Sequence, residues 1–354
     1  MNGADSRHMA HALRLAARGL GNTWPNPAVG CVIVTQGRVV GRGWTQPGGR
    51  PHAEVVALAQ AGAAARGATA YVTLEPCAHH GKTPPCAEAL IAAGVLRVVV
   101  ALTDPDQRVS GRGLAMLRAA GVEVVEGVLT DAARVMQRGF LNRVTLGRPM
   151  LTLKLATSFD GRIATGGGDS QWITGPEARR HVHLLRSQHD AVMVGGGTAR
   201  ADLPGLNVRD LGVTHQPLRV VVAREAVPDL PEGPGYGPLW RVTGQGGGGQ
   251  GRVIRVAEDA RGLDPLAIMQ ALAAEGLTRV FCEGGGQLAA ALLRSGQVDE
   301  LVGYSAGVVI GGDGRASVGA MSLNRLTDAP RFDLIEVQRI GPDLFHRWRL
   351  RRDG

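Results

Sequence analysis

The first 147 residues alternate between short apolar runs and longer segments in which apolar side chains recur at helical spacing. Apolar runs bounded by glycine, proline or charged residues predict strands over residues 31–36, 39–44, 69–74, 97–105 and 122–127. Helical spacing predicts helices over residues 5–20, 86–93, 111–120 and 131–145, and an alanine-rich helix that begins at His52. Strands that alternate with helices indicate a layered α/β domain whose ligands bind at the strand ends. We expect this first domain to span residues 1–147.

A second α/β domain is expected over residues 148–354. The same patterns predict strands over residues 150–156, 191–194, 218–223 and 279–286, and helices over 176–188, 264–276 and 287–296. Residues 227–252 are rich in glycine and proline and include GQGGGGQG, which predicts a solvated, poorly ordered surface insertion. We find no internal repeat that links the two halves.

Three glycines, residues 284–286, end one predicted strand and open the next helix. Backbone N–H groups at such a helix N-terminus form a good cradle for a phosphate or another anion. The glycines do not fit G-x-G-x-x-G, so they do not indicate a Rossmann dinucleotide site. A tight strand-to-helix turn without a ligand explains the same residues.

Composition narrows the possible classes of protein. A chain of 354 residues is long for a single core, and with only 4% aromatic residues its cores must be filled by alanine, valine and leucine. The chain has no run of 18 apolar residues, the start MNGADSRH is not a signal peptide, and four cysteines do not make a disulfide scaffold. We therefore expect a cytoplasmic protein without a membrane partner.

The net charge of +8 raises the possibility of a nucleic-acid partner. However, the arginines are scattered along the chain, and few aromatic residues are available to stack bases. A small phosphorylated substrate would favour the same arginines. We expect that kind of substrate and no nucleic acid.

One stretch of the first domain has the residue types of a catalytic zinc site. His52 and Glu54 form an H-x-E at a helix start, while Cys77 follows a strand and Cys86 closes a loop. One imidazole and two thiolates supply three tetrahedral zinc ligands and leave the fourth position for water. Glu54 is placed to exchange a proton with that water without binding the metal, which is how zinc deaminases divide these roles.

The spacing leaves other interpretations open. Zinc deaminases commonly carry P-C-x-x-C, whereas eight residues separate the two cysteines here. A structural zinc site closed by a fourth ligand such as Cys31, His79 or His80 is one alternative. Two unrelated buried cysteines are another. The adjacent glutamate favours the catalytic site, because a structural site has no use for it.

Motifs along nearly the whole chain resemble one known family, the bifunctional riboflavin-biosynthesis deaminase/reductases of the RibD type. These motifs are PNPAVGCVIV, HAEVVAL, YVTLEPCAHHGKTPPC, the DP and GRG of TDPDQRVSGRG, KLATSFDGRIAT, SQWIT and the EGGG turn. The long cysteine spacing is the one that this family uses. Several independent motifs in the right order across both domains make a chance similarity untenable.

The resemblance implies a cytidine-deaminase-like zinc domain followed by a dihydrofolate-reductase-like domain. The first would deaminate 2,5-diamino-6-ribosylamino-4(3H)-pyrimidinone 5′-phosphate. The second would use NADPH to reduce the ribosyl group to ribityl, giving 5-amino-6-ribitylamino-uracil 5′-phosphate. One zinc ion per chain and NADPH are the implied cofactors, and we expect a homo-oligomer, either a dimer or a tetramer.

The resemblance also implies roles for individual residues. Zinc would be held by His52, Cys77 and Cys86, with Glu54 as the proton shuttle. The deaminase substrate would be contacted by Asn26, Lys82 and Asp104, although turn chemistry alone would also explain Asn26. The reductase substrate would be contacted by Ser170, Arg186, Leu206, Arg209 and Glu283. NADPH would be contacted by Ala156, Trp172, Thr198, Asp202, Gly285, Gly286, Gln287, Leu288, Ala289, Ala290 and Ala291.

Four further positions are worth noting. Lys154 and Asp160 stand in motif positions without a firm role. Thr45 replaces a histidine that the family usually carries, and Asp106 replaces an asparagine. Both replacements lie on the substrate side of the deaminase, so they leave the zinc ligands intact and put the substrate contacts in question.

Overall fold

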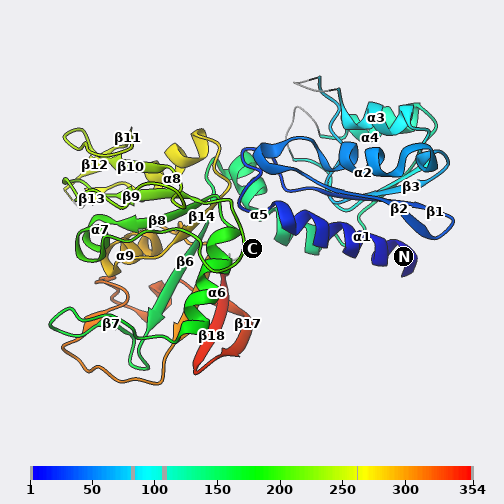
Figure 1. Cartoon of the computed structure of the whole chain (residues 1–354). Helices are drawn as coiled ribbons and strands as arrows, with labels where there is room; N and C mark the ends of the chain where they lie inside the picture. Colours follow the sequence, from blue (N-terminus) through cyan, green and yellow to red (C-terminus); the bar gives the residue numbers. More distant parts are fainter. Residues whose placement is uncertain (1–2, 81–83, 106–109, 261, 352–354) are drawn as a thin grey trace. The chain divides into compact units, whose positions relative to one another are not determined.

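The computed structural model describes residues 3–80, 84–105, 110–260 and 262–351. It divides into two compact units, residues 1–147 and 148–354 (Figure 1). Short 3-10 turns lie at Ala17–Gly19, Pro47–Gly49, Gly62–Ala65 and Leu326–Asp328.

Unit 1 is built on a five-stranded sheet in the order β2-β1-β3-β4-β5. Strand β1 is antiparallel to β2 and β3, and β3, β4 and β5 are parallel. The strands are β1 (Gly30–Thr35), β2 (Arg38–Trp44), β3 (Thr69–Val72), β4 (Arg97–Val100) and β5 (Glu123–Glu126). The helices are α1 (Gly3–Ala16), α2 (Ala53–Ala61), α3 (Cys86–Ala92), α4 (Arg112–Ala119) and α5 (Thr130–Leu146).

Both faces of this sheet are covered, which explains why its strands are apolar without a strict alternation. One core joins alternate strand residues such as Ile33 and Val98 to α2, α3 and α4. A second core joins the intervening residues, such as Val32 and Val99, to α1 and α5 on the opposite face (Figure 1). Because a Cβ on Gly43 would lie 2.1 Å from the Ala53 carbonyl oxygen, only glycine lets the start of α2 pack this closely on β2.

Unit 2 is built on a nine-stranded sheet in the order β11-β10-β9-β8-β14-β6-β15-β18-β17. All pairs from β11 to β15 are parallel, and β18 and β17 add an antiparallel edge. Its strands are β6 (Met150–Thr157), β8 (Ala191–Gly195), β9 (Leu218–Val222), β10 (Leu239–Thr243), β11 (Arg252–Arg255), β14 (Arg279–Cys282), β15 (Glu300–Ser305), β17 (Phe332–Ile340) and β18 (Asp343–Leu350).

The rest of unit 2 consists of helices and two short strand pairs. The helices are α6 (Pro176–Ser187), α7 (Gly196–Asp202), α8 (Pro265–Ala274) and α9 (Gly286–Arg294). The pairs are β7 (Arg162–Ala164) with β16 (Arg315–Ala316), and β12 (Glu258–Asp259) with β13 (Gly262–Leu263). Helices α6 and α7 contribute to a core with β8, β14, β15 and β18. Within the described residues, no helix is long and apolar enough to cross a membrane.

The prediction of a solvated insertion over residues 227–252 was wrong for residues 239–243, although residues 232–235, 245–246 and 248–249 are exposed. Strand β10 lies inside this range, is buried along its whole length, and pairs with β9 and β11. Two buried arginines satisfy the carbonyl groups of the surrounding loops: Arg219 donates to Gly237 (2.8 Å) and Arg241 to Gln250 (2.8 Å). These guanidinium groups therefore supply the hydrogen bonds that buried carbonyl groups usually receive from a neighbouring strand or from water.

Candidate active sites

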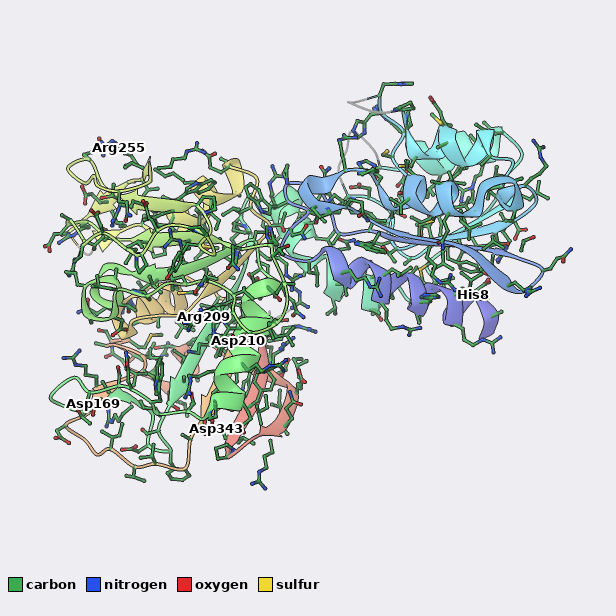
Figure 2. All side chains as sticks on the ribbon, in the orientation of Figure 1. His8, Asp169, Arg209, Asp210, Arg255 and Asp343 are labelled. Atoms are coloured by element: carbon green, nitrogen blue, oxygen red, sulfur yellow. The ribbon has the colours of Figure 1, made fainter. Side chains whose placement is uncertain are left out.

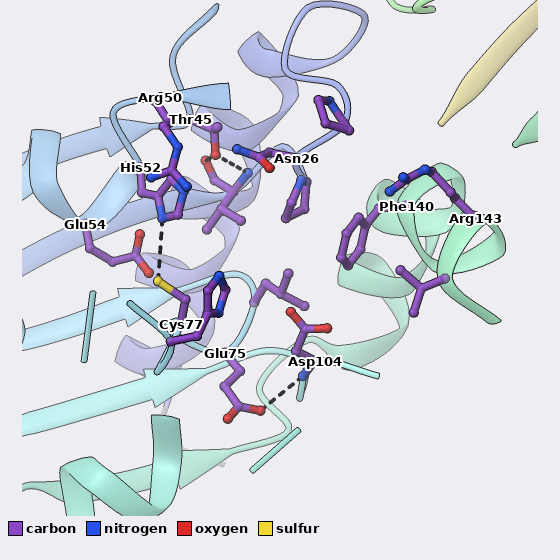
Figure 3. Close-up of a pocket in the computed structure, with 16 residues that line it drawn as sticks. Asn26, Thr45, Arg50, His52, Glu54, Glu75, Cys77, Asp104, Phe140 and Arg143 are labelled. Atoms are coloured by element: carbon purple, nitrogen blue, oxygen red, sulfur yellow. Dashed lines mark hydrogen bonds between the residues drawn. The ribbon is translucent and has the colours of Figure 1, made fainter. Parts of the chain in front are cut away.

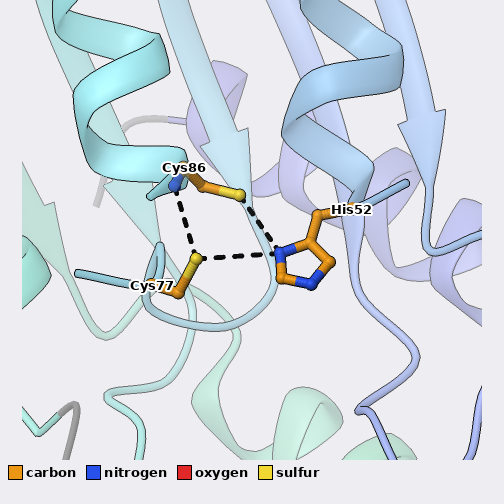
Figure 4. A group of neighbouring side chains, drawn as sticks. All are labelled: His52, Cys77 and Cys86. Atoms are coloured by element: carbon orange, nitrogen blue, oxygen red, sulfur yellow. Dashed lines mark hydrogen bonds between the residues drawn. The ribbon is translucent and has the colours of Figure 1, made fainter. Parts of the chain in front are cut away.

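The three predicted zinc ligands converge in unit 1. His52 is the N-cap residue of α2, Cys86 is the first residue of α3, and Cys77 lies in the loop after β3 (Figure 4). The His52 Nδ1 atom lies 3.3 Å from the Cys86 Sγ and 3.7 Å from the Cys77 Sγ, and all three ligand atoms lie within 4.8 Å of one another. Zinc bonds of about 2.0 to 2.3 Å in a tetrahedron place donors roughly 3.5 to 4 Å apart. The donor set therefore fits zinc in both chemistry and spacing.

The cluster also favours a thiolate. Hydrogen bonds from the Cys86 thiol, from His52 and from the Cys86 backbone lower the pKa of Cys77 to about 4, against the effect of burial. The Cys86 backbone N–H donates to the Cys77 Sγ at 3.3 Å. A thiolate is the form of cysteine that binds a metal.

Glu54 lies in the first turn of α2, and only 3% of it is exposed. Burial, and next the Cys77 thiolate, raise the pKa of Glu54 to about 7. A carboxyl group with this pKa can both accept and release a proton at neutral pH, as general acid–base catalysis requires.

A cavity of about 280 Å³ opens over this cluster (Figure 3). Asn26 and Asp104, two of the predicted substrate contacts, line it together with His52, Glu54 and Cys77. Lys82, the third predicted contact, and Asp106 lie outside the described residues. The structure thus brings two of the three predicted contacts to the cavity.

Two residues of the cavity wall are held by backbone groups. The Asn26 side-chain amide donates to the Gly49 carbonyl at 2.9 Å, so part of its hydrogen-bonding capacity shapes the turn. Thr45, which stands where the family usually has histidine, accepts from the Val29 N–H at 2.9 Å. The threonine hydroxyl therefore binds the backbone of Val29, whereas the longer side chain of a histidine would project further into the cavity.

Sequence reasoning missed other residues of the cavity wall, among them Arg50, Glu75, Phe140 and Arg143. Glu75 could have been found, since it directly precedes Pro76-Cys77 in the zinc motif. Phe140 and Arg143 lie on α5, far along the chain, and only tertiary packing brings them here.

The second site contains three charged side chains of unit 2 that are mostly buried. Glu283, directly after β14, accepts from the Arg186 Nε and from its Nη2 at 3.0 Å, and lies 3.9 Å from the Lys154 Nζ. Arg186 also donates to the Asn207 carbonyl at 2.7 Å. Strand β6, strand β14 and helix α6 thus present one anion and two cations at the strand ends, where ligands of parallel sheets bind.

The glycine turn lies at the start of α9. Gly284 (φ 98°) and Gly285 (φ 85°) both have left-handed backbones, which favour glycine. A Cβ on Gly285 would lie 3.0 Å from the Thr198 Oγ1, and one on Gly286 2.8 Å from the Ala316 carbonyl. Three predicted cofactor contacts, Thr198, Gly285 and Gly286, therefore lie together.

The remaining predicted reductase contacts vary in exposure. Leu206, Ala289 and Ala290 are buried in the core, so their side chains are not presented to solvent. The half-buried residues are Ala156, Ser170, Leu288 and Ala291, and the exposed ones are Trp172, Asp202, Arg209 and Gln287. Arg209 is labelled in Figure 2, and the Arg179 guanidinium lies 4.6 Å from the centre of the Trp172 ring.

Comparison with known proteins finds relatives for both units. Residues 3–102 match the cytidine and deoxycytidylate deaminase zinc-binding region, and residues 149–346 match the RibD C-terminal domain. The riboflavin biosynthesis protein RibD of Escherichia coli is 43% identical over 96% of this chain and 98% of its own length. The chain belongs to the RibD family.

Solved structures of the RibD family have the same fold as this chain. RibD of Acinetobacter baumannii superposes with a TM-score of 0.88 at 38% identity, covering 98% of this chain and 99% of the other. A deaminase/reductase from Thermotoga maritima superposes with a TM-score of 0.86 at 32% identity, with the same coverage. These matches confirm the fold class, a cytidine-deaminase-like domain followed by a dihydrofolate-reductase-like domain.

As a RibD-family member, the chain is a bifunctional deaminase and reductase of riboflavin biosynthesis, with zinc and NADPH as cofactors. The alternative of a four-ligand structural zinc site fails among the described residues, because no fourth donor joins His52, Cys77 and Cys86. Cys31 is buried in β1, His79 lines the cavity without joining the cluster, and His80 pairs with Glu88 at 3.1 Å. The open fourth position is typical of a catalytic zinc.

In this RibD-family reductase domain, protonation of Glu283 should lower the free energy of unfolding at acid pH. Burial raises the pKa of Glu283, but the charges of Arg186 and Lys154 lower it by more than burial raises it. The net pKa is about 2, against an ordinary value of 4.5. A carboxylate with a depressed pKa stabilises the fold above its unfolded pKa and loses that contribution as the pH falls through the folded value. We expect roughly 3 kcal/mol to be lost between pH 4.5 and pH 2.

Urea unfolding of the full chain across this pH window, followed by tryptophan fluorescence, measures the loss. In Glu283→Gln the free energy of unfolding should depend less on pH across this window. Glu275→Gln, which removes the partner of Arg252 on the surface, should keep the wild-type dependence. If the unfolding free energy of Glu283→Gln fell with pH as steeply as that of the wild type, Glu283 would not be the source of the acid sensitivity.

Proposed function

We propose that the deaminase domain acts on 2,5-diamino-6-ribosylamino-4(3H)-pyrimidinone 5′-phosphate and that the reductase domain reduces the ribosyl group of the product to ribityl with NADPH. The Thermotoga maritima relative is described as a diaminohydroxyphosphoribosylaminopyrimidine deaminase and 5-amino-6-(5-phosphoribosylamino)uracil reductase, which supports these substrates. The observation that carries the first activity is the three-ligand cluster with Glu54 beside it, opening into a cavity.

The deaminase chemistry follows from the positions of these residues. Zinc held by His52, Cys77 and Cys86 would acidify water and so supply a nucleophile at neutral pH. Glu54 takes a proton as the water oxygen bonds to the ring carbon, and it delivers that proton to the amino nitrogen. The carbon–nitrogen bond then breaks and ammonia leaves. Asn26 and Asp104 hold the ring at the cavity wall, where correct orientation lowers the barrier.

The reductase chemistry requires orientation of the opened ribose. NADPH supplies the hydride that reaches the C1 carbon of the sugar. Arg186 already donates three hydrogen bonds within the chain, to Glu283 and to the Asn207 carbonyl, so its main contribution is to hold Glu283 and the Asn207 backbone. Exposed Arg209 is then the better candidate to bind the substrate phosphate, for which a guanidinium fork is well suited.

One experiment tests both activities. Purified protein is supplied with the pyrimidine substrate, and ammonia release and NADPH oxidation are followed in the same sample. We expect ammonia release to precede NADPH oxidation. A single-stranded oligonucleotide is the control for a nucleic-acid deaminase, and ammonia release from it but not from the pyrimidine would overturn the proposal.

Thr45→His should lower the Michaelis constant for deamination. The histidine would extend from a buried wall position into the cavity and add a hydrogen-bonding group that threonine, bound to Val29, does not offer. Zinc content should stay unchanged, because Thr45 is not a ligand. Steady-state kinetics together with metal analysis checks this, and an unchanged Michaelis constant would show that the threonine is neutral.

The enzyme is proposed to be a homo-oligomer, a dimer or a tetramer. Edge strand β17 exposes Leu334 (51%), Ile335 (44%) and Val337 (56%) on unit 2. An exposed apolar edge strand is an association surface unless it is covered. Sedimentation of the full chain tests this, and a monomer at micromolar concentration would contradict it.

A reducing compartment such as the cytoplasm is the proposed location. All four cysteines are free thiols, and two of them are needed as metal ligands. An oxidising compartment would favour a Cys77–Cys86 disulfide over metal binding. Cell fractionation with an antibody to the chain checks the location, and recovery from an oxidising compartment would refute it.

A further inference from the structure

The Glu75 side chain joins two other backbone segments, the segment after β4 and the start of α4, at the wall of the deaminase cavity. This side chain is 4% exposed and lines the cavity between β3 and Cys77 (Figure 3). One carboxylate oxygen accepts from the N–H groups of Asp104 (3.2 Å) and Gly111 (3.0 Å), and the other accepts from Gly113 (3.0 Å). A glutamine side chain at this position could not accept all three bonds, because its amide has only one acceptor oxygen.

Of the three donors, only Asp104 lines the cavity, and the two glycines lie behind the wall that Asp104 and Glu75 share. Asp104 follows β4 and is itself a wall residue, while Gly111 and Gly113 lie at the N-terminal end of α4. A carboxylate near a helix N-terminus is favourable because the free N–H groups and the helix dipole are positive there. A Cβ on Gly113 would lie only 1.9 Å from the Pro76 carbonyl oxygen, so the start of α4 packs directly on the residue that precedes Cys77.

We propose that Glu75 is a positioning residue of the deaminase that fixes the backbone of Asp104 and thereby sets the affinity of the cavity for the pyrimidine. The inference rests on the proposed deaminase function. Glu75 uses its oxygens on backbone donors, so it acts through Asp104 and not on the reacting atoms. Its loss should therefore raise the Michaelis constant for deamination more than it lowers kcat.

Glu75→Gln in the full chain tests the proposal. We expect the Michaelis constant for ammonia release to rise about 10- to 100-fold, because at least one buried N–H loses its acceptor. Zinc should stay at one ion per chain, and NADPH oxidation on deaminated substrate should match the wild type. Glu123→Gln, an exposed carboxyl on β5, is the matched control and should leave both activities unchanged.

A double-mutant cycle with Asp104→Asn separates positioning from general support of the fold. If Glu75 acts through Asp104, the two changes in Michaelis constant are not additive. Additive changes, or a lower kcat with an unchanged Michaelis constant, would overturn the proposal, and so would loss of zinc from a folded protein. Should Glu75→Gln fail to fold, Glu75→Asp decides: its shorter side chain should also raise the Michaelis constant, and a wild-type value would refute the proposal. Wild-type protein that releases no ammonia would instead refute the deaminase function itself.

Discussion

Glu54→Gln should abolish ammonia release while leaving zinc and the reductase in place. The amide keeps the size of the carboxyl group and the start of α2, but it can neither accept the proton from water nor deliver it to the leaving nitrogen. General acid–base catalysis alone contributes about 10²- to 10⁴-fold. Since Glu54 serves both proton transfers, we expect a loss at or beyond the upper end of that range.

The measurement is ammonia release at saturating substrate, with metal analysis of the same preparation. NADPH oxidation on deaminated substrate is the internal control, because its residues lie in unit 2. Glu123→Gln is again the surface control in unit 1. Ammonia release within tenfold of the wild type would remove Glu54 from the proton path.

Glu283→Gln should give the largest loss in the reductase. Glu283 is the acidic partner of Arg186 and Lys154, and its removal leaves two mostly buried cations without that partner. Breaking a buried ion pair in this way costs about 3–5 kcal/mol. The cations would move, and a displacement of about 1 Å at a reacting centre can cost 10²-fold in rate.

We therefore expect kcat/KM for NADPH oxidation to fall by about 100-fold or more, with ammonia release unchanged. Lys154 should respond as well, because burial lowers its pKa and Glu283 opposes that shift. Glu275→Gln, at the end of α8, is the control in the same unit. A wild-type rate in Glu283→Gln would show that the charged cluster stabilises the fold without serving the reaction.

The zinc cluster could be predicted from the sequence because its signal lies in residue types. Histidine, glutamate and two cysteines close together in the chain leave few alternatives, and the structure shows the ligands within reach of one metal ion. Most helices and strands through residue 296 were also predicted, because their apolar residues recur with the periods that burial requires.

Other features left no such signal. Strand β10 was concealed by its glycine- and proline-rich neighbours. The loops beside it are held by two buried arginines, a residue type that is mostly exposed in proteins. No element was predicted for β15, β17 and β18, and β17 has no buried face to create a pattern. The role of Glu75 was hidden because its partners are backbone N–H groups, which any residue except proline supplies.

The two units have separate hydrophobic cores, and this has a genetic consequence. Both cores described for unit 1 come from residues before 147, and the core described for unit 2 comes from residues after 148. A substitution that inactivates one site need not disturb the other fold. A cell that makes a Glu54→Gln chain and a Glu283→Gln chain together would carry one working copy of each activity. Such a pair of alleles is expected to complement and restore growth without added riboflavin, although neither allele does so alone.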